Sequence, residues 1–209
     1  MKITDLSPGG YASTCYFVTE GKDAVLIDCS ADVSTVRKAL AQSDTTLHAI
    51  LCTHGHFDHV LTADELRDGL DVPLLIHGED AEMLADADKN AFRYFAGYER
   101  KWRPAERTFS QGDVLDFGAL SFTVMHLPGH SKGSSAFLAN GVAFTGDTIF
   151  ANGFGRYDLY GGHGADLLRS LNRLKTVPPE TVIYPGHGES APLGVALDRI
   201  FQKNPNDLR

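Results

Sequence analysis

Residues 53–59 read THGHFDH, and this stretch decides how the rest of the chain is interpreted. It follows an apolar run, Leu47–Cys52, that predicts a β-strand. Four side chains that can bind a metal ion lie within six consecutive residues: His54, His56, Asp58 and His59. Imidazole and carboxylate ligands together suit zinc, iron or manganese. We therefore interpret the motif as a metal-binding loop at the end of a strand, with a polar surface loop as the alternative.

Three more turns of small residues follow apolar runs later in the chain, and each exposes a potential metal ligand. They read PGHS, TGDT and PGHG, and their ligands are His130, Asp147 and His187. Proline and glycine before a histidine indicate a rigid turn that displays the side chain. Together with the first motif, these turns provide five histidines and two aspartates, a number that suits two adjacent metal ions.

The composition is that of an ordinary globular protein, with 209 residues, 43% hydrophobic and 22% charged side chains. This length fits one sizeable domain, so we expect residues 1–209 to form a single domain. A formal net charge of −8 argues against non-specific binding to nucleic acid or to anionic membranes. No apolar run is long enough to cross a bilayer, no signal-peptide pattern is present, and the three cysteines form no C-x-x-C pair. We therefore expect a cytoplasmic protein with reduced thiols.

Strands and helices follow each other along the chain in two similar halves. Cys15–Thr19 and Ala24–Asp28 are β-rich runs that predict a hairpin, and several further β-rich runs follow Gln111. Helices are expected at Val33–Ala41, Glu79–Ala87, Ala165–Lys175 and Pro192–Phe201. Because each half has strands first and helices later, the pattern predicts an α/β (α+β) sandwich of sheets covered by helices.

The roles of three features stay open at the level of sequence. Ala91–Pro104 is dense in aromatic residues, which either pack against the core or cover the site. Gly153–Gly164 holds five of the 21 glycines and is therefore expected to be irregular. Asp28, at the end of a predicted strand, either caps the following turn or orients a metal ligand.

The ordered motifs HGHFDH, PGHSKGS, FTGDTIF, GFGRYD and YPGHGE resemble the metallo-β-lactamase superfamily, and specifically its branch of small hydrolases similar to glyoxalase II. The resemblance implies a four-layer αββα sandwich with two metals at one edge. It implies the following ligands: His54, His56 and His130 for one metal, Asp58, His59 and His187 for the other, and Asp147 as a bridge. Zinc is the expected metal and iron or manganese the alternative, because nitrogen and oxygen ligands suit all three.

The same resemblance implies a thioesterase of the hydroxyacylglutathione hydrolase type, acting on S-D-lactoylglutathione or a similar small-molecule thioester. Two divalent ions about 3.5–4 Å apart can convert a bridging water into hydroxide at neutral pH and polarise the substrate carbonyl. Asp58 and Asp147 are then the catalytic carboxylates. Asp147 bridges the metals, and Asp58 acts first as a ligand and then as a proton acceptor.

Substrate binding is assigned less directly. Arg156 lies where glyoxalase II enzymes carry a basic residue that contacts glutathione, and an ion pair with Asp158 is the alternative. Tyr157 and Tyr160 in the same segment are further candidates. Full-length glyoxalase II enzymes have an additional C-terminal helical domain, whereas about twenty residues follow PGHGE here. We therefore expect an enzyme that accepts the glutathione thioester and also thioesters with a truncated thiol portion.

Other functions compete with this interpretation. Persulfide dioxygenase-like enzymes of the superfamily hold one iron, but they tend to read PAH where this chain has Pro185-Gly186-His187. A lactone, phosphodiester or β-lactam hydrolase would use the same two metals. A metal-binding protein without catalysis is disfavoured, because all seven ligand positions hold competent residues. The oligomeric state is not indicated by any pattern in the sequence.

Overall fold

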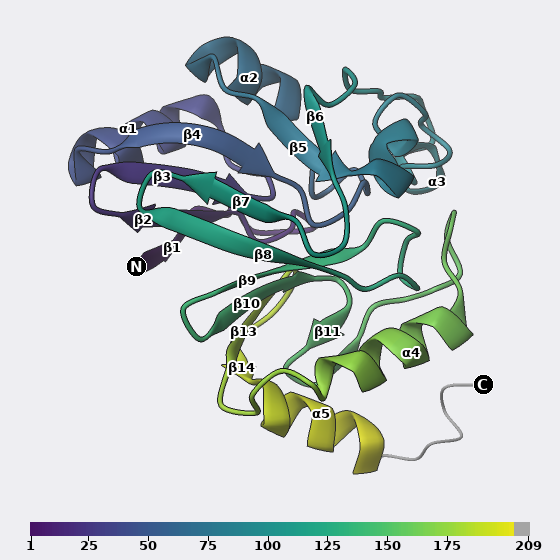
Figure 1. Ribbon diagram of the computed structural model, residues 1–209. Helices are drawn as coiled ribbons and strands as arrows, with labels where there is room; N and C mark the ends of the chain where they lie inside the picture. Colours follow the sequence, from purple (N-terminus) through teal and green to yellow (C-terminus); the bar gives the residue numbers. More distant parts are fainter. Residues whose placement is uncertain (203–209) are drawn as a thin grey trace.

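The computed structural model describes residues 1–202 and contains two six-stranded sheets packed face to face (Figure 1). In spatial order, the first sheet contains β1 (Lys2–Asp5), β2 (Tyr16–Glu20), β3 (Asp23–Ile27), β4 (Thr46–Leu51), β5 (Leu74–His77) and β6 (Arg107–Phe109). In spatial order, the second contains β14 (Ala191–Pro192), β13 (Val182–Pro185), β10 (Val142–Gly146), β9 (Ser135–Ala139), β8 (Leu120–His126) and β7 (Val114–Phe117). A small separate sheet pairs β11 (Ile149–Phe150) with β12 (Gly153–Phe154).

Helices cover both outer faces of this pair of sheets (Figure 1). The first sheet is covered by α1 (Val33–Ser43) and α2 (Ala63–Leu70). The second sheet is covered by α4 (Gly164–Leu174) and α5 (Leu193–Gln202). Two shorter helices, the 3₁₀ helix η1 (Gly78–Met83) and α3 (Phe92–Ala96), lie between β5 and β6 in the chain. The structure therefore confirms the predicted αββα sandwich.

Apolar side chains fill three layers between these elements. The central layer, between the two sheets, contains the buried rings of Phe122, Phe137 and Phe144. In the outer layers, Val36 joins α1 to the first sheet and Leu171 joins α4 to the second. Strands that are covered on both sides, such as β3 and β5, are therefore nearly continuous apolar runs, whereas β7 and β8 contain alternating buried and exposed residues.

The strand directions bring several loops to one edge of the sandwich. β3, β4, β5 and β6 run parallel to one another, and β10 runs parallel to β13. In such sheets the loops at the carboxyl ends of the parallel strands meet at the same edge, where ligands usually bind. The loops after β4, β10 and β13 carry three of the four sequence motifs.

Most of the predicted elements are present. β2 and β3 form the predicted hairpin, and α1, α4 and α5 correspond to three of the predicted helices. The prediction of a helix at Glu79–Ala87 was wrong, because residues 79–83 belong to the 3₁₀ helix η1, which ends at Met83, and residues 84–87 are not helical. The buried residues of η1, Asp80 and Met83, lie three apart, which is the repeat of a 3₁₀ helix.

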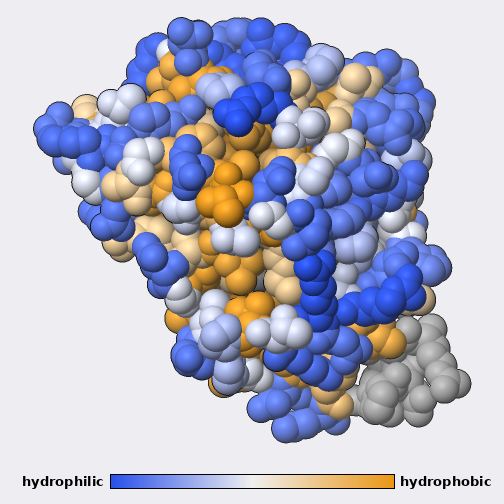
Figure 2. Space-filling view, viewed as in Figure 1, coloured by the Kyte–Doolittle hydropathy of each residue, from blue (hydrophilic) through white to orange (hydrophobic). Residues whose placement is uncertain are grey.

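The surface of the molecule is mixed in character. Figure 2 shows apolar residues gathered in the middle of one face, between mainly hydrophilic borders. Val114 of the edge strand β7 is among the exposed apolar side chains. Among residues 1–202, no helix combines the length and the apolar character needed to cross a membrane.

Candidate metal centre

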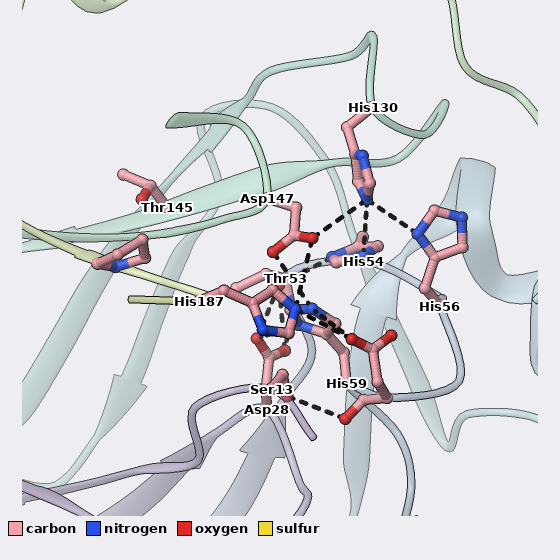
Figure 3. Close-up of polar contacts among 12 residues, drawn as sticks. Ser13, Asp28, Thr53, His54, His56, His59, His130, Thr145, Asp147 and His187 are labelled. Atoms are coloured by element: carbon pink, nitrogen blue, oxygen red, sulfur yellow. Dashed lines mark hydrogen bonds and ion pairs between the residues drawn. The ribbon is translucent and has the colours of Figure 1, made fainter. Parts of the chain in front are cut away.

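The seven predicted ligands converge at one edge of the sandwich (Figure 3). They come from four connections: the loop after β4, the loop between β8 and β9, the turn after β10 and the turn after β13. Close packing of these turns depends on Gly186. A Cβ atom at this position would collide with Asp147 Oδ1 and lie 2.5 Å from His59 Cε1. Glycine is therefore required where the His187 turn passes the other ligands.

The first group of ligands consists of His54, His56 and His130, all of them buried. His130 Nε2 lies 2.9 Å from His56 Nδ1 and 3.1 Å from His54 Nε2. Burial, together with the neighbouring imidazoles, lowers the pKa of His54 and lowers that of His56 to about 3. Both rings are therefore neutral at pH 7, and each has a nitrogen lone pair available as a ligand.

Contacts on the far side of two of these rings, those of His130 and His54, indicate which nitrogen carries the proton. His130 Nδ1–H donates to the backbone carbonyl of Arg156 at 2.7 Å, and His54 Nδ1 lies 3.2 Å from Thr53 Oγ1. Each arrangement leaves the Nε2 lone pair pointing toward the centre of the group. His56 faces the same point through its Nδ1, and its Nε2 is buried without a hydrogen-bond partner. Three imidazole nitrogens that meet in this way can share a cation.

The second group consists of Asp58, His59 and His187. His187 Nε2 lies 3.0 Å from Asp58 Oδ2, and His59 Nε2 lies 3.7 Å from the same oxygen. Asp147 stands between the two groups. Its Oδ1 is 3.3 Å from His59 Nε2, and its Oδ2 is 3.7 Å from both His130 Nε2 and His187 Nε2. This carboxylate can therefore contact both groups.

The structure shows that Asp28 contacts one of the predicted metal ligands. It lies just after β3 with a left-handed φ of 58°, and its side chain is buried. Its Oδ2 accepts a hydrogen bond from His59 Nδ1–H at 2.8 Å, and its Oδ1 accepts one from the backbone N–H of Thr53 at 2.8 Å. Asp28 thus orients His59, and its contact with Thr53 supports the beginning of the THGHFDH loop. Thr53 is the first residue of the THGHFDH motif, but no local pattern predicted its contact with Asp28.

The electrostatics of the centre also suit a cation. Burial acts to lower the pKa of His59, but Asp28, Asp58 and Asp147 outweigh it and raise that pKa well above its ordinary value. Conversely, burial acts to raise the pKa of Asp147, and the surrounding histidines outweigh it and lower that pKa. Among the described residues, His59 Nε2 and Asp147 Oδ1 are buried without a hydrogen-bond partner. The donor set therefore fits two divalent cations, one for each group.

A cleft of about 620 Å³ opens onto this centre. Five predicted ligands form its polar part: His56, Asp58, His130, Asp147 and His187. The rest of its lining is mostly apolar and consists of Tyr11, Phe57, Ala91, Phe95, Ala96, Leu159 and Arg156. No local pattern marks Tyr11 and Leu159 as cleft residues, whereas Phe57 lies inside the THGHFDH motif.

The aromatic segment Ala91–Pro104 divides between the two roles considered for it. Phe92 and Trp102 are buried in the outer apolar layer of the first sheet. Phe95 is 53% exposed and lines the cleft, and its ring lies 5.6 Å from that of Phe57. One part of the segment therefore packs against the core, and another part forms a wall of the cleft.

Arg156 lines the cleft and is also paired with Asp158, through contacts of 2.7 and 2.8 Å. The ion pair considered for Arg156 is therefore present, and its part in substrate binding stays a prediction. Tyr157 packs with the outer apolar layer of the second sheet, and the Tyr160 hydroxyl donates to Glu82 Oε1 at 2.6 Å. Neither tyrosine is among the residues that line the cleft, so a part for them in substrate binding stays a prediction.

Comparisons with known proteins agree with this geometry. A family model described as the metallo-beta-lactamase superfamily matches residues 8–187. The probable metallo-hydrolase YqgX of Bacillus subtilis is 31% identical over 191 residues, and the match covers 90% of each chain.

Two solved structures are similar along nearly their whole length. The BLEG-1 B3 metallo-beta-lactamase is 31% identical with a TM-score of 0.88, and the match covers 94% of this chain and 97% of that one. TTHA1623 in a di-iron-bound form is 34% identical with a TM-score of 0.83, and the match covers 95% and 99%.

Proposed function

The chain belongs to the metallo-beta-lactamase superfamily, and we propose that it is a dinuclear metal-dependent hydrolase that cleaves thioesters of the hydroxyacylglutathione type. The position of Asp147 is the observation that carries this proposal. One carboxylate lies within 3.7 Å of His130 on one side and within 3.3 Å of His59 on the other. A residue placed in this way can hold two cations close together, which is the arrangement of a two-metal hydrolase.

The proposal assigns each metal three ligands besides the shared carboxylate. His54, His56 and His130 would hold the first ion; Asp58, His59 and His187 would hold the second. Two such ions, when bound, lower the pKa of a water between them and polarise a carbonyl oxygen. Zinc is the metal we propose, because neutral imidazole and carboxylate suit it. The di-iron form of TTHA1623 supports iron as the alternative.

The protein side chains supply positioning and proton transfer. Asp58 faces the cleft and lies 3.0 Å from His187 Nε2, so it can act as a ligand and can accept a proton on its second oxygen. The apolar walls around Phe57 and Leu159 would hold the acyl group and exclude bulk water from the reacting carbonyl.

The character of the cleft supports a relaxed preference for the thiol portion of the substrate. Arg156 is the cation in its lining, and the paired Asp158 partly compensates its charge. Its guanidinium also lies 5.7 Å from the ring of Phe95, so it is held against an apolar wall. Strict recognition of a charged tail needs several placed polar groups, whereas the cleft residues other than Arg156 and the predicted metal ligands are mostly apolar. We therefore propose that a glutathione thioester is accepted but that the glutathione is not required.

β-Lactam hydrolysis is a second candidate, favoured by the likeness to BLEG-1 over nearly the whole chain. A β-lactam carbonyl would meet the same side chains in the cleft, so the two reactions are separated by their substrates.

A substrate panel tests both candidates. Metal-quantified protein is assayed with S-D-lactoylglutathione, an N-acetylcysteamine thioester, a lactone, a β-lactam and a persulfide. We expect both thioesters to be turned over, with kcat/KM values within about 100-fold of each other, because loss of one charged contact costs about 1–3 kcal/mol. Turnover confined to the β-lactam, or oxygen uptake with the persulfide, would contradict the thioesterase proposal.

A further inference from the structure

Asp80 is a buried carboxylate close to the metal centre that contacts none of the seven predicted ligand side chains. It lies in η1, and its side chain is fully buried. An ionised or polar group in such a position is costly unless hydrogen bonds satisfy it. Its partners therefore indicate why the chain keeps a carboxylate there.

Three donors surround Asp80, and they come from two different loops. The backbone N–H of Gly55 donates to Oδ2 at 3.1 Å, and the Ser131 hydroxyl donates to the same oxygen at 2.6 Å. The backbone N–H of Gly133 donates to Oδ1 at 2.6 Å. All three partners are hydrogen-bond donors, so an ionised carboxylate, which only accepts, matches the site better than an amide.

These donors lie directly beside predicted metal ligands in the sequence. Gly55 lies between His54 and His56, and Ser131 directly follows His130. One carboxylate therefore joins the two loops that supply all three ligands of the first group. No other residue of η1 makes a side-chain hydrogen bond to either loop in the described part of the chain.

The packing around Asp80 is as close as its hydrogen bonding. A Cβ atom on Gly133 would lie 2.8 Å from Asp80 Cβ, closer than ordinary contacts allow. Ser131 Oγ also lies 2.7 Å from Ser134 Oγ, and the Ser134 hydroxyl accepts from the backbone N–H of Ser131 at 3.0 Å. The loop that carries His130 is thus held by a connected polar network, and such networks are rigid when every member is satisfied.

We propose that Asp80 is a positioning residue that sets the separation of the His54–His56 loop from the His130 loop and thereby the affinity of the first metal group. This inference rests on the proposed function, because it assumes that the three histidines bind a metal. Asp80 acts through the backbone of the loops, unlike Asp28, which contacts His59 directly. Asp80 is not among the residues that line the cleft.

Binding of Zn²⁺ to metal-free protein, followed by competition with a chromophoric chelator, measures the effect. We expect Asp80→Ala to weaken one of the two binding steps by about 10- to 100-fold and to leave the other unchanged, as is typical for loss of a group that supports metal ligands. Asp80→Asn retains the shape and part of the hydrogen bonding, so its zinc affinity should fall by a smaller factor. Glu79→Ala, an exposed neighbour in η1, is the matched control and should bind both ions as the wild type does.

Two backgrounds show which group Asp80 supports. In an Asp58→Ala background, which damages the second group, the effect of Asp80→Ala should persist. In a His56→Ala background, which damages the first group, it should disappear, because coupled residues are not additive. Equal weakening of both steps, or an unchanged effect in the His56→Ala background, would overturn the inference.

A third variant removes one contact without disturbing the carboxylate. Ser131→Ala should weaken the same step as Asp80→Ala by a smaller factor, and this variant decides the question if Asp80→Ala does not fold. Wild-type affinity in both Ser131→Ala and Asp80→Asn would also overturn the inference. A wild-type protein that binds fewer than two ions would instead contradict the proposed function, so the two failures are distinguishable.

Discussion

Replacing Asp28 tests how the second metal group is built. The carboxylate accepts hydrogen bonds from His59 Nδ1–H and from the backbone N–H of Thr53, both at 2.8 Å, in a site that is 1% exposed. Asp28→Ala leaves both N–H donors without their acceptor, and it also removes the acceptor of the Thr53 hydroxyl, which donates to Asp28 Oδ2 at 2.9 Å. Because each unsatisfied buried donor costs about 1–3 kcal/mol, loss of the two N–H contacts alone should lower the free energy of unfolding by about 2–6 kcal/mol.

Asp28→Asn separates stability from metal binding. The amide oxygen can still accept from Thr53, so we expect a smaller loss of stability, about 1–3 kcal/mol. The amide NH₂, however, faces His59 Nδ1 and favours the tautomer with the proton on Nε2, the nitrogen that points toward Asp147. Zinc affinity of the second group should therefore fall by about 10- to 100-fold.

Two measurements check these expectations. Urea unfolding of the metal-free proteins gives the loss of stability, and zinc competition gives the affinity of each binding step. Asp32→Asn is the control, since the same chemical change is made at the exposed N-cap of α1, where asparagine caps equally well. An Asp28→Asn protein that binds both ions with wild-type affinity would refute the proposed role of the Asp28–His59 contact.

Further predictions concern catalysis, the core and pH. Asp147→Ala should lower kcat far more than Arg156→Ala, which should mainly raise KM; equal losses of kcat at full metal content would show that the roles are wrongly assigned. Phe137→Ala, between the sheets, should lower the free energy of unfolding by about 3–5 kcal/mol in urea unfolding. The control Val114→Ala, at an exposed position, should change this free energy by less than about 0.5 kcal/mol. Burial and the nearby His126 lower the pKa of His77 to about 4, so the unfolded chain binds more protons between pH 4 and about 6.5. Stability should therefore fall as the pH is lowered through this range, and less steeply in metal-free His77→Gln; parallel pH profiles of the two proteins would contradict this.

The sequence predicted those parts of the site whose signal is local. His54, His56, Asp58 and His59 lie within one loop, so their grouping requires no knowledge of the fold. The other three ligands were found because each follows an apolar run and a glycine turn. The convergence of Asp147 and His187 depends on the parallel pairing of β10 with β13, which the repeated pattern of strands before helices indicated. His130, in contrast, lies in the loop between the antiparallel strands β8 and β9.

The residues that the sequence did not reveal depend on contacts between distant segments. Asp80 is 25 residues from Gly55 and 51 residues from Ser131, and nothing in its own neighbourhood marks it. Tyr160 shows the opposite case. Its closeness to Arg156 in sequence suggested a place in the cleft, whereas its hydroxyl reaches Glu82, 78 residues away. The walls of a cleft follow the paths of loops, which local patterns do not predict.

Titration of zinc into metal-free protein, while hydrolysis of S-D-lactoylglutathione is followed, tests the dinuclear thioesterase most directly. Because the donor atoms form two groups joined by Asp147, we predict that activity rises until two zinc ions are bound per chain and then stays constant. Activity that reaches its maximum with one ion per chain, or no thioester hydrolysis with two ions bound, would contradict the proposal.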